Sequence, residues 1–349
     1  MDPNSMAKKA PISDLIPSGT RPTQQTIADM TGLAVTTVSK ALRSDPKISE
    51  KTRQLVEKVA KEVGYVPDRA AQRLRTGKTH VISLILDPHN EILGFGNSMI
   101  TGIVEALQGT NYHLNITPHF TPGHIMEPVV NIVRNGLADG LIFSRTRALD
   151  ERVRFLSERD FPFVTHGRTE FSKQHNFVDY DNEAFAYQAV MRLVAKGCNK
   201  VCILLPLSKF TFYQHMRYGF MRAVRETGVD HLLPEDVSLD SPSDQLVAWA
   251  KGLAGTDAMP DGIICPGETS YFAVENGFAA GGKRQEQDYC VVAKSVSAVL
   301  PLNNPNLDLI AEDVKEAGFL MGQSLLEVLS SPEKAPRQIL QEPTLKFPI

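Results

Sequence analysis

Residues 23–42, TQQTIADMTGLAVTTVSKAL, contain two short amphipathic helical patterns separated by a glycine. The inward positions are Ile27, Ala28 and Met30 in the first pattern and Val38, Ala41 and Leu42 in the second. Gly32 permits the backbone to reverse direction, and Leu33 fills the gap between the two helices. The stretch therefore predicts a helix-turn-helix.

The outward face of the second helix is short, mostly polar and carries cations. Helical spacing places on it Val35, Thr36, Ser39, Lys40 and Arg43. Such a face suits the major groove of DNA. An ordinary helical hairpin has the same pattern, so the motif by itself leaves both interpretations open.

A third helix is expected over residues 47–64, KISEKTRQLVEKVAKEVG, with Ser49 as its N-cap and Gly64 as its stop. Its apolar face is expected to consist of Leu55, Val56, Val59 and Val63. After Tyr65 comes the basic stretch DRAAQRLRTGK (68–78), which is too short to be a stable helix alone. We expect it to fold only when a partner orders it.

Charge is divided unevenly along the chain. Residues 20–79 hold twelve Lys and Arg against six Asp and Glu, whereas residues 80–349 hold 23 against 32. A basic head on an acidic body is typical of a protein whose head binds a polyanion. The alternative is a solvated, charged helical surface.

Five stretches carry a family resemblance: TIADMTGLAVTTVSKAL, ISEKTRQLVEKVAKEVGYVPDRAAQRLRTGKT, DYDNEAFAYQAV, VVAKS and IAEDVKEAGFLMGQSLLEVL. Through them the chain resembles the lactose-repressor (LacI/GalR) family of bacterial transcription regulators from about residue 21 to residue 349. In that family the second helix enters the major groove and a hinge helix inserts a leucine into the minor groove.

The resemblance implies individual DNA contacts. Base reading falls on Val35, Thr36 and Lys40, phosphate-side contacts on Thr37 and Ser39, and the minor-groove wedge on Leu74. The remaining expected DNA-binding residues are Thr23, Arg43, Tyr65, Arg69 and Arg73. Leu74 could equally pack against the body. One departure is Ala34, which stands where the family usually has a serine that caps the recognition helix.

The remaining 270 residues alternate short apolar runs with helical segments. The runs are VISLIL (81–86), YHLNIT (112–117), GLIF (140–143), FPFVTH (161–166), KVCILL (200–205), GIIC (262–265) and YCVVA (289–293). This alternation, with a late helix over 313–329 and a last strand near 344–347, predicts two doubly wound parallel-sheet lobes.

The predicted fold class is thus an all-α headpiece followed by an α/β core like that of periplasmic (type I) sugar-binding proteins. We expect a disordered arm over 1–20, beginning with the vector-like MDPNSM, a headpiece over 21–66, a hinge over 67–79 and a core over 80–349. The N-lobe is expected at about 80–197 and 310–330, and the C-lobe at about 198–309 and 331–349.

Ligands of open parallel sheets bind beyond the carboxyl ends of the strands. In the first lobe these positions hold Asp87, Arg168 and Asp181, and the resemblance adds Phe95 as an aromatic that stacks on the effector. A carboxylate is a strong hydrogen-bond acceptor for sugar hydroxyls. The alternatives are that Asp181 caps the helix starting at Glu183 and that Phe95 belongs to the core.

The second lobe matches the family less well. Met216 stands where the family has an arginine, and Arg217 comes one residue late, which rotates it by about 100° on a helix. Glu268 replaces a usual aspartate, and Lys294 and Ser295 replace an aromatic and an aspartate. These residues are the candidate ligand contacts here. Lys294 permits an anionic or phosphorylated sugar, and a structural role for it is the alternative.

Other chemistry is scarce in the sequence. The four cysteines lack metal-finger spacing, and H-E-x-x-H, G-x-S-x-G and P-loop motifs are missing. We expect no catalytic residue, no metal and no cofactor. No signal peptide and no 18-residue apolar run occur in the sequence, so a cytoplasmic protein without a membrane partner is expected.

These observations favour a homodimeric regulator, first of all a repressor, that binds double-stranded DNA at a near-palindromic operator and responds to an effector, expected to be a sugar. The alternatives are a sugar-binding protein of the transport type, a regulator with a nucleobase or phosphorylated effector, and an α/β enzyme that uses the cleft. The basic head weighs against the transport protein, and the missing nucleophile and base weigh against the enzyme.

Overall fold

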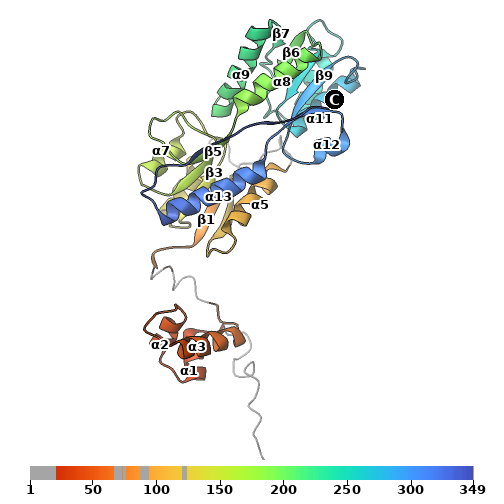
Figure 1. The fold of residues 1–349 in the computed structure, drawn as a ribbon. Coiled ribbons are helices and arrows are strands. Elements are labelled where there is room, and N and C mark those ends of the chain that lie inside the picture. The colour runs from red at the N-terminus through yellow and green to blue at the C-terminus, as the bar shows by residue number, and fades with distance from the viewer. Residues whose placement is uncertain (1–20, 67–72, 74–75, 87–93, 120–123, 349) are drawn as a thin grey trace, which may run out of the picture. The chain divides into compact units, whose positions relative to one another are not determined.

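The structure is a computed structural model that describes residues 21–66, 73, 76–86, 94–119 and 124–348. The chain divides into two compact units, residues 1–79 and 80–349 (Figure 1). The first contains the headpiece and the second contains both lobes of the core.

The headpiece consists of α1 (Gln24–Thr31), α2 (Val35–Ala41) and α3 (Glu50–Glu62). Thr23 caps α1 in a reciprocal capping box with Thr26, and Ser49 caps α3 by accepting from the Thr52 amide. Gly32 has φ +70°, the left-handed conformation that the reversal between α1 and α2 requires. The predicted helix-turn-helix geometry is therefore present.

The headpiece core is small and apolar. Its fully buried side chains are Ile27, Val38, Ala41 and Val56. The expectation that Leu55 belongs to this core is wrong, because Leu55 is 45% exposed and Ala60 is buried instead. A step of about 100° per residue puts position 60 on the same face as positions 56, 59 and 63, and it leaves position 55 outside that face.

Each core lobe is built on a six-stranded sheet. The first has the order β11 (Gln338–Gln341), β5 (Phe177–Tyr180), β4 (Phe163–His166), β3 (Gly140–Phe143), β1 (Val81–Leu86) and β2 (His113–Pro118), all parallel. The second has the order β12 (Thr344–Lys346), β10 (Asp308–Ala311), β9 (Cys290–Ser295), β8 (Gly262–Cys265), β6 (Lys200–Ile203) and β7 (Asp230–Leu232). In this second sheet only β12 is antiparallel to its neighbour.

Helices cover the sheets. The N-lobe helices are α5 (Phe95–Leu107), α6 (Met126–Arg134), α7 (Glu151–Ser157) and α13 (Val314–Ser330). The C-lobe helices are α8 (Asn182–Ala195), α9 (Thr211–Thr227), α10 (Ser243–Leu253), α11 (Glu268–Ala280) and α12 (Val299–Asn303). α13 lies directly against α5 (Figure 1), and a Cβ at Gly102 would stand 1.9 Å from the Lys315 carbonyl oxygen. Only glycine permits this approach.

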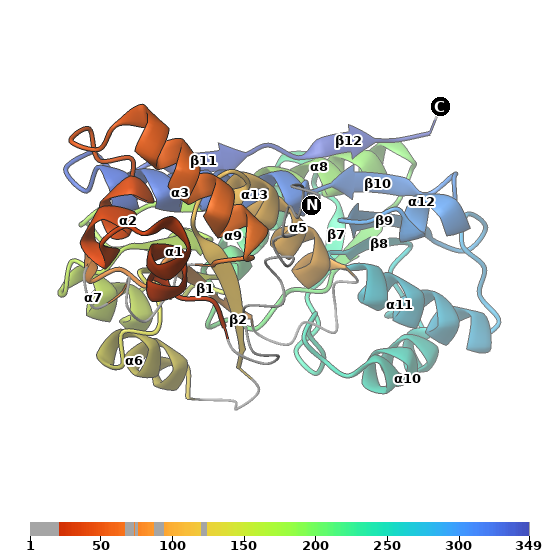
Figure 2. The ribbon, with the colours of Figure 1, turned by 90° about the horizontal axis from the view of Figure 1, so that it is seen from below.

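The lobe boundaries differ from those expected. α8 was expected in the N-lobe, but the buried face that it presents, with Phe185 and Val190, joins the cluster around Ile203 and Val292 of the C-lobe. β11 was expected in the C-lobe, but it extends the N-lobe sheet beside β5. The chain therefore crosses between lobes at β5 to α8, β10 to α13 and β11 to β12, and Figure 2 shows β11 and β12 in succession.

Among the described residues, no helix combines the length and the apolar character that a membrane crossing requires.

Candidate ligand cavity and nucleic-acid interface

The outer face of α2 carries the side chains expected to read DNA. Thr36, Lys40 and Arg43 are exposed, and Thr37 and Ser39 are half-buried. Arg43 Nε donates to the Ser39 carbonyl at 2.8 Å, which orients the guanidinium along the last turn. The helix and the turn after it thus present donors and two cations to solvent.

Three of the other expected DNA contacts have structural roles in the headpiece. Val35 is half-buried and packs against the headpiece core, as Tyr65 does, and the hydroxyl of Thr23 accepts the Thr26 amide. Arg73 is exposed. Arg69 and Leu74 lie outside the described residues, so their expected roles stay predictions.

The start of α2 has no side-chain cap. Ala34 occupies the N-cap position, and no side-chain hydrogen bond is made there, whereas Thr23 and Ser49 cap the other two helices. The first-turn amides of α2 therefore depend on backbone partners, such as the Ala34 carbonyl that accepts from Thr37 N at 2.8 Å.

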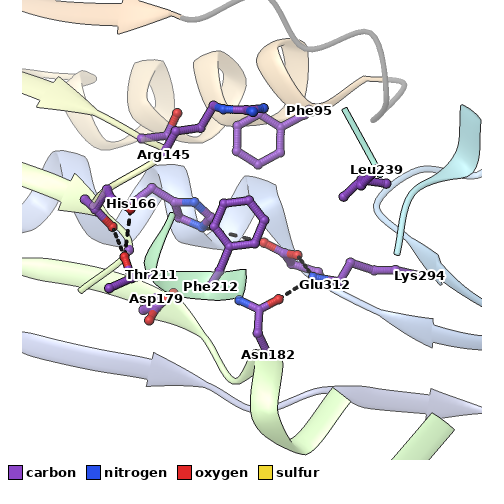
Figure 3. Close-up of a pocket in the computed structure, with 13 residues that line it drawn as sticks. Phe95, Arg145, His166, Asp179, Asn182, Thr211, Phe212, Leu239, Lys294 and Glu312 are labelled. Carbon is purple, nitrogen blue, oxygen red and sulfur yellow. Dashed lines mark hydrogen bonds and ion pairs between the residues drawn. The ribbon is translucent and has the colours of Figure 1, made fainter. Parts of the chain in front are cut away.

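A cavity that is partly open to solvent lies between the lobes. Side chains from both lobes converge on it (Figure 3). Its lining consists of Phe95, Ser144, Arg145, Thr146, His166, Gly167 and Asp179 from the N-lobe, Asn182, Thr211, Phe212, Leu239 and Lys294 from the C-lobe, and Glu312 at a crossing. The expected contacts Phe95 and Lys294 are therefore on its wall.

Lys294 is buried at the cavity wall in a charge cluster. Its Nζ donates to Glu312 Oε2 at 3.0 Å and to Asn182 Oδ1 at 2.8 Å. The same ammonium lies over the ring of Tyr180, 4.1 Å from the ring centre. The positive charge is thus compensated within the protein, which favours the structural role of Lys294 over recognition of a phosphate.

Phe95 was expected either to contact the ligand or to belong to the core, and its position is compatible with both. It is buried in the N-lobe core cluster and it also lines the cavity. Its ring meets that of His166 edge to face, with 5.5 Å between the ring centres. His166 Nε2 lies 3.6 Å from Glu312 Oε1. The rings of Phe95 and His166 and the carboxylate of Glu312 therefore lie next to one another on the cavity wall.

Asp179 is a buried carboxylate on the cavity wall. Burial raises its pKa to about 6, and Glu312 adds to this rise while Arg168 opposes it. Arg168 Nε lies 3.2 Å from Asp179 Oδ2 and 3.3 Å from His215 Nε2. Arg168, an expected ligand contact, is not among the lining residues and holds Asp179 in place instead.

Burial, with the charge of Arg168 as a second cause, lowers the pKa of His215 to about 4. The neutral imidazole can accept a hydrogen bond from Arg168 Nε. Among Asp179, Arg168 and His215, the positive charge is therefore that of the Arg168 guanidinium.

Asp181 and Arg217, two further expected contacts, are not among the lining residues. Asp181 is the N-cap of α8 and accepts a hydrogen bond from the Ala184 amide at 2.9 Å. Helix capping was the alternative to ligand binding in the sequence analysis. Arg217 is exposed beside a second, shallower groove with Tyr218 and Arg225, because Met216 takes the inward position on α9. Asp87 lies outside the described residues.

Glu268 and Ser295 are buried in the C-lobe and bind its own backbone. Glu268 Oε1 accepts from the amides of Val296 and Ser297 and from the Ser297 hydroxyl at 2.8 Å. Ser295 Oγ donates to the Ser297 carbonyl at 2.9 Å. The two residues therefore fix the turn after β9, and neither is among the cavity-lining residues.

The sequence analysis did not identify several cavity residues, chiefly Arg145, His166, Asp179, Thr211 and Glu312. Two of them carry a usable signal. Asp179 interrupts the apolar run FVDY, and His166 ends the run FVTH. A polar residue at the carboxyl end of an otherwise apolar strand is a candidate ligand contact, because ligands of parallel sheets bind beyond these ends.

No group of three or more metal-ligating side chains gathers in the part of the chain that the structure describes. All four cysteines are free thiols, and Cys202 and Cys265 lie in the strands β6 and β8 of the C-lobe.

Two family models match the chain. Residues 23–68 match the model for bacterial regulatory proteins of the lacI family, and residues 190–347 match a periplasmic binding protein-like domain. The HTH-type transcriptional regulator AglR of Rhizobium meliloti is 32% identical over 208 residues, which is 58% of this chain and 58% of that relative. That relative is a transcriptional regulator, the class of protein predicted for this chain.

Solved structures share the fold. A complex of the transcriptional regulator CelR with cellobiose has a TM-score of 0.68 at 22% identity and covers 94% of this chain and 99% of its own. A lac repressor dimer bound to operator and the anti-inducer ONPF has a TM-score of 0.80 at 17% identity and covers 93% and 98%. The chain therefore joins a headpiece that matches the lacI family of bacterial regulatory proteins to a core that matches a periplasmic binding protein-like domain.

Proposed function

We propose that this chain is a homodimeric repressor of transcription that binds a near-palindromic operator and is controlled by an uncharged sugar held between its lobes. Two observations together carry the proposal: the cavity is polar and charge-compensated, and the headpiece exposes Thr36 and Lys40 on its second helix and Arg43 in the turn after it. Two headpieces on one dimer would contact two half-sites of an operator.

The cavity favours an uncharged polyhydroxyl ligand. Lys294 is paired with Glu312, Arg145 with Asp240 and Arg168 with Asp179. Because these cations have carboxylate partners, a phosphorylated effector would have to displace one of them. Hydroxyl, amide and carboxylate groups on the wall supply hydrogen bonds, and Phe95 and Phe212 supply apolar faces for a sugar ring.

The relatives support the same assignment. A structural neighbour was solved with cellobiose and another with an operator and an anti-inducer. A ligand in the cavity would alter the angle between lobes and thereby the affinity for DNA, which is a coupling between two sites.

A thermal-shift screen of mono- and disaccharides, cellobiose included, against sugar phosphates and nucleobases tests the effector class, because a ligand of the native state raises Tm. We expect a concentration-dependent rise with a neutral sugar. If only sugar phosphates or nucleobases raised Tm, the effector would belong to one of those classes and not to the neutral sugars.

Selection of bound sequences from a randomised duplex pool tests operator binding. Repeating the selection with the ligand that was found shows whether this ligand weakens or strengthens DNA binding. A protein that enriches no sequence in either condition would refute the regulator.

A matched pair of variants on α9 locates the ligand. Phe212→Ala removes an aromatic cavity wall and is expected to weaken the sugar by about tenfold or more. Tyr218→Ala removes an aromatic on the same helix that is 56% exposed and outside the cavity, so it should leave the affinity unchanged. Equal affinities in both variants would place the ligand elsewhere.

A further inference from the structure

Arg145 reaches across the cavity from one lobe to the other. It follows β3 in the N-lobe and forms an ion pair with Asp240, which lies between β7 and α10 of the C-lobe. Both side chains are 13% exposed. The guanidinium carbon also lies over the Phe210 ring, 4.2 Å from its centre. Arg145 is therefore held by a charge and by an aromatic face of the opposite lobe.

A second contact lies beside the first. Thr211, the first residue of α9, donates its amide to the Thr146 carbonyl at 3.0 Å and its hydroxyl to the same oxygen at 2.8 Å. The hydroxyls of Thr146 and Thr211 are 3.0 Å apart and buried. The amide of Thr211 is thus protected by an acceptor on the other lobe, which makes it a reporter of contact between the lobes.

The N-lobe presents Arg145 on a stiff loop. The buried Arg152 donates through Nη2 to the carbonyls of Ser144 at 3.1 Å and Arg145 at 3.0 Å, and Asp150 holds Arg152 at 2.8 Å. Arg145 has φ +56°, a left-handed conformation that a residue with a side chain keeps only when its surroundings enforce it. The backbone that carries the Arg145 side chain is accordingly fixed by contacts within the N-lobe.

Asp240 is likewise anchored in its own lobe. Its Oδ2 accepts the Leu207 amide at 2.9 Å, which ties it to the segment that leads from β6 into α9. Lys209 also lies over the Phe210 ring, 5.1 Å from the ring centre, on this segment. The partner surface for Arg145 therefore moves with the start of α9.

The contact lies away from the chain crossings. The crossings leave the sheets at β5 and β11 in the N-lobe and at β10 and β12 in the C-lobe. Arg145 follows β3, which β4 separates from β5, and Asp240 follows β7, the strand at the opposite edge of the C-lobe sheet from β12. A rotation of the lobes about the crossings that widens the cavity must consequently separate Arg145 from Asp240.

We propose that Arg145, Asp240 and Phe210 form a latch that keeps the lobes closed over the cavity without effector, so that Arg145 controls entry to the site. The word latch denotes these three residues. That the entering ligand is a sugar rests on the proposed function. The latch itself rests only on contacts within the core. Breaking the ion pair shifts the lobes toward an open arrangement, and ligand entry requires the same opening.

Hydrogen exchange of the full-length protein, with neither DNA nor ligand added, tests the latch. Asp240→Asn removes the charge that holds Arg145 but keeps an oxygen that can accept from Leu207 N. We expect the Thr211 amide to exchange about tenfold faster or more in this variant, while amides of β8 keep their protection and exclude global unfolding. Asp288→Asn, which removes a C-lobe carboxylate 3.4 Å from Lys283, should leave Thr211 unchanged.

Arg145→Gln breaks the latch from the other lobe and should accelerate Thr211 exchange to the same extent. The double variant should add little to either single variant, because both remove one interaction. Unchanged Thr211 exchange in both single variants would overturn the latch. Faster exchange of Leu207 with Thr211 unchanged would also overturn it, because Asp240 would then only brace its own loop. A failure of sugar or operator binding would leave this readout unaffected.

Discussion

Lys294 and Glu312 form a buried ion pair, with Lys294 Nζ 3.0 Å from Glu312 Oε2. Lys294 stands in β9 opposite Ile310 of β10, and Glu312 follows β10 where the chain crosses to the N-lobe. Asn182, the first residue of α8 at another crossing, accepts from the same ammonium. The ammonium of Lys294 thus connects the C-lobe sheet to two of the segments that cross between the lobes, and it lies on the cavity wall.

Glu312→Gln should destabilise the core strongly, because it leaves the ammonium of Lys294 buried without a counter-charge. Removal of one partner of a buried pair costs about 3 kcal/mol or more. Denaturant unfolding with a fixed m-value measures the loss. Adding Lys294→Met should recover much of it, since the unpaired charge is then gone. A loss below about 0.5 kcal/mol in the single variant, the size of an exposed pair, would contradict this role of the pair.

Acid should weaken the core partly through His175. Burial lowers the pKa of His175 from its ordinary 6.5 to about 4, although the charge of Asp150 opposes this. The folded protein therefore binds fewer protons than the unfolded chain between about pH 4 and 6.5, and stability falls as the pH falls through this window. The contribution has a slope of about 1.4 kcal/mol per pH unit.

His175→Gln removes this contribution, so the stability difference between variant and wild type should shrink as the pH falls from 6.5 to 4. Equilibrium unfolding at half-unit pH steps measures it. The exposed His124, replaced in the same way, provides the control. A difference that stays constant over this window would contradict the buried neutral imidazole. Asp179 acts in the opposite direction, because its raised pKa gives the folded protein extra protons below about pH 6.

Most of the strands that the sequence predicted are buried apolar runs, although the exposed edge strands β2 and β12 were predicted as well. VISLIL and GIIC are continuous apolar runs, and both are central strands of their sheets. β7 and β11 were not predicted, because their residues are largely exposed at sheet edges and carry no apolar run. The lobe assignment of α8 failed for a related reason. Periodicity shows which face of a helix is apolar but not which sheet that face covers.

The candidate site was predicted in part. Phe95 and Lys294 were both identified through their family positions, and both line the cavity. Asp181 marks the correct strand end, yet its neighbours Asp179 and Asn182 face the cavity. Arg145 and Glu312 could not have been identified, because their partners Asp240 and Lys294 are distant in sequence and meet only after both sheets have formed.

Lys40 should contribute to DNA binding through its charge and position on the exposed face of α2. Lys40→Ala is expected to weaken operator binding by about 1–3 kcal/mol if it reads a base, with less discrimination at that base pair. Lys61→Ala, at the exposed end of α3, removes the same charge away from α2 and serves as the control. Fluorescence anisotropy at several salt concentrations separates the two. Equal losses in both variants would reduce Lys40 to a general electrostatic contribution.

Ala34→Ser should stabilise the headpiece. Ala34 has φ −65° and ψ 143°, an extended N-cap geometry, and it lacks the side-chain oxygen that Thr23 and Ser49 supply to α1 and α3. A serine hydroxyl at this position can accept an amide hydrogen bond from the first turn of α2, which is worth on the order of 1 kcal/mol.

The position of the cap makes its effect visible in DNA binding as well. α2 is only seven residues long, so its order depends heavily on its ends and on packing against α1 and α3. We expect slower amide exchange in the first turn of α2 and tighter operator binding in Ala34→Ser. Ala34→Val, which changes the side chain without adding an oxygen, is the control, because valine is as poor an N-cap as alanine. If the serine variant gains neither headpiece protection nor operator affinity over the unchanged protein and the valine variant, the missing cap does not limit α2.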